Sequence, residues 1–167
     1  MNLRNSILIL AVLGAVGFAL YEGLIRTNPA PAVTFTSIKG EKIGTPELRG
    51  RVVLVNFWAT DCSTCVREMP RLVQTYNTHR GQGFEVIAVA MRHDPPNYVL
   101  NYTEKNALPF KVALDPMGDL AKAFGDVKLT PTTILIDKRG NIVTRILGEP
   151  NFTKLDALIA EKLAEPA

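Results

Sequence analysis

The sequence predicts an α/β domain in which a mixed central β-sheet is flanked by helices, with an N-terminal β-hairpin and a central helix–strand insertion. Two apolar, β-branched runs, Val52 to Trp58 and Phe84 to Ala90, predict strands that are buried on both faces. A helical stretch separates them, which is the order of a β-α-β unit. Near the C-terminus, the turn Lys138-Arg139-Gly140-Asn141 predicts a hairpin, so parallel and antiparallel strands share the sheet.

The first half of the domain opens with the predicted hairpin, residues 33–43, whose apolar positions alternate loosely. Residues 46–50, Pro-Glu-Leu-Arg-Gly, predict a turn before the first buried strand. After that strand we expect a helix from about Ser63 to His79. Pro70 lies inside this helix and lacks a backbone N–H, so we expect a kink there.

The second half is expected to contain the helix and strand of the insertion, a short helix, the two strands of the C-terminal hairpin and a final helix. Their predicted ranges are 98–106, 110–114, 119–124, 132–137, 142–147 and 152–164. Gly125 ends the short helix, because glycine accepts the left-handed conformation that follows many helices. Asn151 precedes the final helix and is a suitable N-cap.

The N-terminus carries an uncharged apolar run, SILILAVLGAVGFAL, which extends with two interruptions to Ile25. About 20 apolar residues span a bilayer core. We therefore expect a signal-anchor helix at residues 1–27, a linker at 28–32 and the folded domain at 33–167. Arg4 lies on the near side of the run, so the positive-inside rule keeps the N-terminus in the cytoplasm.

This prediction anchors the protein in a membrane, with the domain on the extracytoplasmic side. The alternative is a cleaved signal peptide and a soluble periplasmic protein, with Ala30-Pro31-Ala32 as the small-residue cleavage site. Both alternatives export the domain to a compartment where disulfides persist. The net charge of +3 and the absence of a basic run argue against a nucleic-acid partner.

The only two cysteines, Cys62 and Cys65, follow the first buried strand and begin the predicted helix. Two thiols at this spacing in the first turn of a helix lie side by side and can close a disulfide. The helix N-terminus favours thiolate over thiol, because it presents unpaired N–H groups and partial positive charge. The order of strand, Cys-x-x-Cys and helix therefore predicts a redox site.

With these motifs in place, residues 33–165 resemble membrane-anchored thioredoxin-like proteins of the TlpA/ResA type. The residues that carry the resemblance are Asn56-Phe57-Trp58-Ala59, Cys62, Cys65, Glu68, Pro70 and Thr130-Pro131. The resemblance implies a thioredoxin fold and an exported thiol-disulfide oxidoreductase that is anchored in a bacterial inner membrane by its N-terminal helix. It also implies that the redox-active cysteine pair works without a cofactor or a metal.

The partners that the resemblance implies are a client protein that carries a disulfide and a membrane electron donor that reduces the enzyme again. Clients of such proteins include apocytochrome c and the copper-site protein of a terminal oxidase. Within this scheme Cys62 is the expected nucleophile, and Cys65 is expected to release the client from the mixed disulfide.

Four further residues receive expected roles. Pro131 resembles the proline that is cis in this fold, which exposes the backbone of Thr130 for pairing with an extended client segment. Trp58 is assigned to substrate binding, with a plain core tryptophan as the alternative. The resemblance implies that Glu68 tunes the cysteine pKa values; the alternative is a solvated helix carboxylate. Plain thioredoxins have a buried aspartate where this chain has Asn56.

Two other functions remain open from the residues alone. A metallochaperone could hold Cu(I) with the two thiolates, because soft thiolates suit this ion. Against it, the chain lacks extra methionine or histidine ligands near the cysteines. A thiol peroxidase would need a threonine and a proline just before the reactive cysteine, and Trp58-Ala59-Thr60-Asp61 lacks the proline.

Overall fold

The computed structural model describes residues 12–15, 17 and 28–167. A five-stranded sheet with the order β5-β4-β3-β6-β7 forms the centre of the domain. The strands β3, β4 and β5 are parallel to one another, whereas β6 and β7 are antiparallel to their neighbours. Their bounds are Val52–Trp58, Phe84–Ala90, Lys111–Leu114, Thr132–Ile136 and Ile142–Leu147 for β3 to β7. The mixed sheet predicted from the sequence is confirmed.

A separate two-stranded hairpin precedes the sheet. Its strands, β1 (Thr34–Thr36) and β2 (Lys42–Gly44), pair antiparallel as predicted. The predicted turn at residues 46–50 is instead mostly a short 3₁₀ helix, η1 (Thr45–Leu48). Pro46 favours this conformation, because its fixed φ suits the first turn of a helix and it has no N–H to leave unpaired.

The helices occupy the predicted places. Their bounds are Ser63–His79 for α2, Arg80–Gln82 for the 3₁₀ turn η2, Pro96–Lys105 for α3, Asp119–Ala123 for α4 and Phe152–Ala164 for α5. α3 begins two residues earlier than predicted, because Pro96 occupies its first turn, where proline is well accommodated. Asn151 caps α5 as predicted, since its side-chain oxygen accepts a hydrogen bond from the Lys154 N–H at 3.1 Å.

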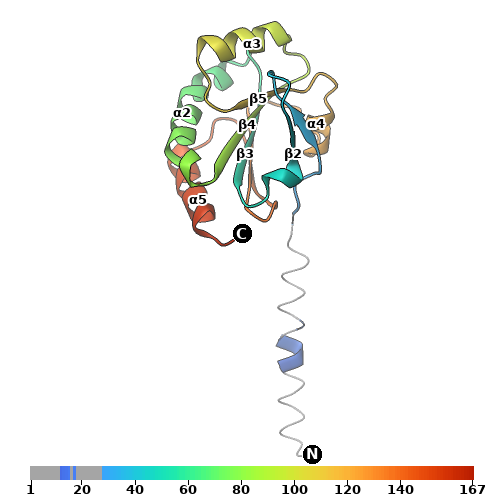
Figure 1. Ribbon diagram of the computed structural model, residues 1–167, viewed down its shortest axis with the longest axis vertical. Coiled ribbons are helices and arrows are strands. Elements are labelled where there is room, and N and C mark those ends of the chain that lie inside the picture. Colours follow the sequence, from blue (N-terminus) through green and yellow to red (C-terminus); the bar gives the residue numbers. More distant parts are fainter. Residues whose placement is uncertain (1–11, 16, 18–27) are drawn as a thin grey trace, which may run out of the picture.

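Alternation along β3 divides the core into two layers. Val52, Leu54 and Trp58 face a cluster that contains side chains of α2, α3 and α5. The intervening apolar residues of β3 face a second cluster with the hairpin, η1 and α4. Figure 1 shows α2 and α5 on one side of the sheet and α4 and β2 on the other. Both faces of β3 are thus covered, which explains its unbroken apolar sequence.

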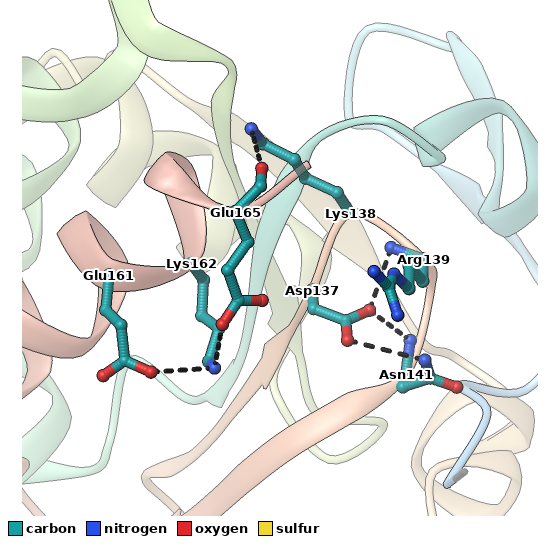
Figure 2. Close-up of polar contacts among 7 residues, drawn as sticks. All are labelled: Asp137, Lys138, Arg139, Asn141, Glu161, Lys162 and Glu165. Atoms are coloured by element: carbon teal, nitrogen blue, oxygen red, sulfur yellow. Dashed lines mark hydrogen bonds and ion pairs between the residues drawn. The ribbon is translucent and has the colours of Figure 1, made fainter. Parts of the chain in front are cut away.

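The end of α5 is attached to the turn between β6 and β7 (Figure 2). The Lys138 ammonium donates to the backbone carbonyls of Leu163 and Glu165, at 2.7 and 2.8 Å. These carbonyls are otherwise unpaired at the end of a helix, so a lysine satisfies them well. Within the turn, one Asp137 carboxylate oxygen accepts hydrogen bonds from the N–H groups of Arg139 and Asn141.

The first residues of the domain also contact this turn. The Ala30 N–H donates to the Gly140 carbonyl at 2.9 Å, and the Asn28 carbonyl accepts from the Ile142 N–H at 2.7 Å. Pro29 forms an isolated β-bridge with Asn141 between these two bonds. The expected linker at residues 28–32 is therefore bound to the folded domain at its first residues.

The expected signal-anchor falls almost wholly on residues outside the described part of the chain. Among the residues that the structure does describe, no helix has both the length and the apolar character needed to cross a membrane.

Candidate active site

Cys62 and Cys65 meet at the end of β3, where the chain turns into α2. They form a disulfide with their Cα atoms 5.2 Å apart, within the usual range for such bridges. Cys62 is the N-cap residue of α2, and its sulfur accepts a hydrogen bond from the Cys65 N–H at 3.2 Å. The helix N-terminus therefore acts directly on the Cys62 sulfur, and it stabilises negative charge there when the bridge opens.

The two sulfurs differ sharply in access. Cys62 is half-buried, whereas Cys65 is 0 % exposed and packs into the core below α2. Thiol–disulfide exchange needs collinear approach of one sulfur to another, so an accessible sulfur reacts and a buried one does not. This difference in access favours Cys62 as the sulfur that exchanges with another protein, the role that the resemblance implies.

Thr130 and Pro131 lie beside the cysteines because β6 runs antiparallel to β3. Thr132 pairs with Phe57 in the register, so the residues before β6 adjoin the end of β3. The Thr130–Pro131 peptide bond is cis, as expected. Thr130 is partly exposed, and within the described part of the chain its backbone makes no hydrogen bond. It is thus available to a client strand.

Glu68 lies one helical turn after Cys65, on the same buried face of α2. Its side chain is 1 % exposed, so the alternative of a solvated carboxylate is wrong. The Asn56 amide donates to Glu68 Oε1 at 3.1 Å and to the Thr133 hydroxyl at 3.2 Å. Asn56 is therefore a hydrogen-bonded residue of the core, at the position where plain thioredoxins have a buried aspartate.

Burial dominates the electrostatics of Glu68. It raises the pKa of the carboxyl to about 7, against the lowering effect of the Asn56 hydrogen bond. The charge of Glu149 raises this pKa further and that of Arg67 lowers it. Glu68 Oε2 has no hydrogen-bond partner among the described residues. A carboxyl with a pKa near 7 can gain or lose a proton at neutral pH. Glu68 lies on the same face of α2 as the buried Cys65 sulfur.

Trp58 is fully buried at the end of β3. Its ring packs on that of Tyr102, with 5.2 Å between the centroids. Trp58 has no exposed surface and packs in the same core cluster as Cys65. This burial favours the core-tryptophan alternative over direct contact with a substrate.

A second acid, Asp94, binds the loop that leads to Cys62, although no motif in the sequence indicates this role. One Asp94 oxygen accepts from the Thr60 N–H and the other from the Thr60 hydroxyl, both at 2.6 Å. Asp94 is buried, and its partner lies 34 residues earlier in the chain. Asp94 precedes two prolines, a pattern that indicates only the start of a loop.

We expect Asp94→Ala to destabilise the domain, because two donors of the partly buried Thr60 lose their acceptor. The expected cost is about 2 to 4 kcal/mol in the free energy of unfolding, from about 1 to 3 kcal/mol for each unsatisfied donor with partial compensation by water. Urea denaturation measures it. The control is Lys128→Ala, which breaks the exposed ion pair with Asp126 and should change stability by less than about 0.5 kcal/mol. Equal effects of the two substitutions would contradict this role.

Asp61, directly before Cys62, also has a partner. His93 Nε2 lies 3.5 Å from Asp61 Oδ1, and both side chains are well exposed. A carboxylate beside a thiolate opposes its ionisation, and a protonated histidine beside the carboxylate weakens that opposition. Asp61 thus places a carboxylate directly before the exposed sulfur, with His93 close enough to pair with it.

Comparison with known proteins decides the family. Residues 26–159 match the family model described as Redoxin. The chain belongs to the Redoxin family. It is 34 % identical over 161 residues to the thiol-disulfide oxidoreductase ResA of Bacillus thuringiensis subsp. konkukian, and the match covers 92 % of each chain. The ResA of Geobacillus kaustophilus is also 34 % identical over 161 residues, which cover 92 % of this chain and 90 % of the relative.

Solved structures agree with this redoxin assignment. The chain superimposes on a thiol:disulfide interchange protein of the thioredoxin family from Chlorobium tepidum with a TM-score of 0.76. The two share 28 % identity, and the match covers 83 % of this chain and 98 % of the other. The protein is therefore a TlpA/ResA-type thioredoxin-like redoxin with protein-disulfide oxidoreductase activity, and its redox-active group is the Cys62–Cys65 pair.

These relatives are named for thiol–disulfide exchange, which favours that function over metal transfer and peroxide reduction. In the described part of the chain, no three side chains of histidine, cysteine, aspartate or glutamate are grouped so that they could hold a metal ion.

Proposed function

We propose that this redoxin is an exported, membrane-tethered reductase of disulfides in client proteins. The observation that carries the proposal is the pairing of one accessible sulfur with one buried sulfur. This arrangement suits a dithiol that captures a client at Cys62 and then frees it through Cys65.

The reaction begins with the reduced enzyme. The Cys62 thiolate attacks one sulfur of the client disulfide, the client S–S bond breaks, and the other client sulfur leaves as a thiolate that takes a proton. Cys65 then loses its proton and attacks the Cys62 sulfur, which breaks the mixed disulfide. The client leaves as a dithiol and the enzyme keeps the disulfide seen here, so two electrons have passed to the client.

We assign two supporting roles in this cycle. Glu68 accepts the proton of Cys65, because its raised pKa matches neutral pH and it lies on the same buried helix face. The backbone of Thr130 pairs with the client segment that carries the reacting cysteine, beside Pro131. Both roles use residues that the sequence predicted.

The sequence supports export and tethering. The apolar run before residue 26 is long enough for a bilayer span, and Arg4 sets its orientation. An exported reductase needs electrons from the cytoplasmic side, so its donor is a membrane electron carrier. The clients that the family resemblance supports belong to cytochrome c maturation or to assembly of an oxidase copper site.

The reduction potential of the Cys62–Cys65 pair tests the direction of the reaction. We expect a value near that of thioredoxin, about −270 mV, when the domain is equilibrated in dithiothreitol or glutathione buffers. A value near −120 mV is typical of a strong oxidant and would replace the proposal with disulfide formation. The matched control is Cys65→Ser, which cannot close the bridge and should show no two-electron transition.

A further inference from the structure

The end of the sheet opposite the cysteines carries the first residues of the domain. Asn28, Pro29 and Ala30 are bound to the β6–β7 turn by two backbone hydrogen bonds and a β-bridge. Because β6 is antiparallel to β3, the first residues of β6 lie near Cys62. The last residues of β6 lie at the opposite end of the strands. In Figure 1 the linker joins the domain at the end away from α3, the helix that follows the other end of the sheet.

The chain has little slack between this end and the apolar N-terminal run. That run ends at Ile25, and Asn28 already accepts a hydrogen bond from the domain. Only Arg26 and Thr27 lie between, so at most about 11 Å of extended chain joins the two. A bilayer that holds the apolar run must therefore bring its headgroups close to the β6–β7 turn.

Two exposed arginines lie on the surface around this turn. The Arg49 guanidinium donates to the Arg139 carbonyl and lies over Gly140. Both arginines are exposed, and neither has a carboxylate partner among the described residues. Asp137, the acid of the turn, is engaged by backbone N–H groups of the turn itself (Figure 2).

We infer that this surface, formed by Arg49, Arg139 and the bound linker, rests on the anionic phospholipid headgroups of the same bilayer. The inference depends on the proposed tethering and adds an orientation to it. Basic side chains near such a surface are attracted by its negative potential. With the linker bound to the domain, Cys62 is held on the side that faces away from the membrane.

The test uses the full chain with both cysteines replaced by serine and a fluorescent label on one new cysteine. Glu47→Cys places the label on η1, two residues before Arg49, and Leu129→Cys places it beside Thr130 at the other end. The proteins are reconstituted in vesicles of phosphatidylcholine and phosphatidylglycerol that contain a headgroup-attached spin quencher. We expect several-fold stronger quenching at position 47 than at position 129. Equal quenching at both positions would overturn the orientation.

A charge variant tests the headgroup contact itself. Arg139→Glu keeps the backbone carbonyl that Arg49 binds, and it should reduce quenching at position 47 in anionic vesicles. Lys122→Glu, on α4, is the control and should leave that quenching unchanged. If Arg139→Glu has no effect, the arginine surface does not contact the lipid.

Flotation of the same vesicles separates this inference from the function on which it depends. A chain that fails to float refutes the tethering, and the orientation with it. A chain that floats with uniform quenching keeps the tethering and refutes only the orientation.

Discussion

The Cys65→Ser variant should accumulate a covalent complex with its client, whereas Cys62→Ser should accumulate almost none. In the first variant the exposed sulfur still attacks the client, but the buried residue that would release it has lost its thiol. In the second, the remaining thiol is 0 % exposed and is out of reach of another protein. Both variants should lose multiple turnover, because each retains only half of the dithiol.

The measurement is a non-reducing gel of cells that express each variant. Any band that disappears when the sample is reduced with dithiothreitol is identified by mass spectrometry. The double variant, with serine at both positions, is the matched control. Equal trapping by the two single variants would contradict the roles that the difference in access assigns. Trapping by Cys62→Ser alone would reverse them.

Glu68→Gln should stabilise the domain progressively as the pH rises. The carboxyl has an ordinary pKa of 4.5, and burial raises it to about 7 in the folded protein. Between these values the folded protein keeps a proton that the unfolded chain has released, so the wild type loses stability as the pH rises through this window. The shift corresponds to about 3 kcal/mol. Glutamine is uncharged throughout and escapes this loss.

Urea denaturation of residues 28–167 between pH 4 and pH 8 measures the effect. We expect the difference in unfolding free energy between variant and wild type to grow by about 3 kcal/mol across this range. Glu104→Gln, at an exposed position of α3, is the control and should give a nearly constant difference. If the curves for Glu68→Gln and wild type stay parallel, the pKa of Glu68 is not raised in the folded protein. The same variant should also shift the cysteine titration, as the sequence suggested.

Most of the fold could be predicted from short sequence patterns. The buried strands, α2 and the C-terminal hairpin follow from apolar runs, glycines and turn residues, which act over a few positions. The pattern was less informative at helix starts, since Tyr98 marked the apolar repeat of α3 while Pro96 began the helix. Element boundaries depend on capping, which the apolar repeat does not report.

Contacts between residues that are far apart in the chain could not be predicted from the sequence. Asn56, Glu68 and Thr133 lie on three different elements, and only the pairing of β3 with β6 brings the last of them to the first. The Thr60–Asp94 contact likewise joins two loops with no shared motif. The Cys-x-x-Cys motif and the family resemblance indicated the reactive pair and its nucleophile, and the difference in burial between the two sulfurs supplies a physical reason for these roles.

The unequal access of the two sulfurs also limits how long an unwanted mixed disulfide can persist on the enzyme. Any unwanted adduct, such as a small thiol or a client captured in the wrong place, forms at Cys62, because Cys65 is sealed in the core. Cys62 is also the one position that Cys65 attacks, so each adduct is ejected by an internal reaction. The lifetime of an abortive complex is then set within the enzyme and is independent of how much free thiol surrounds it.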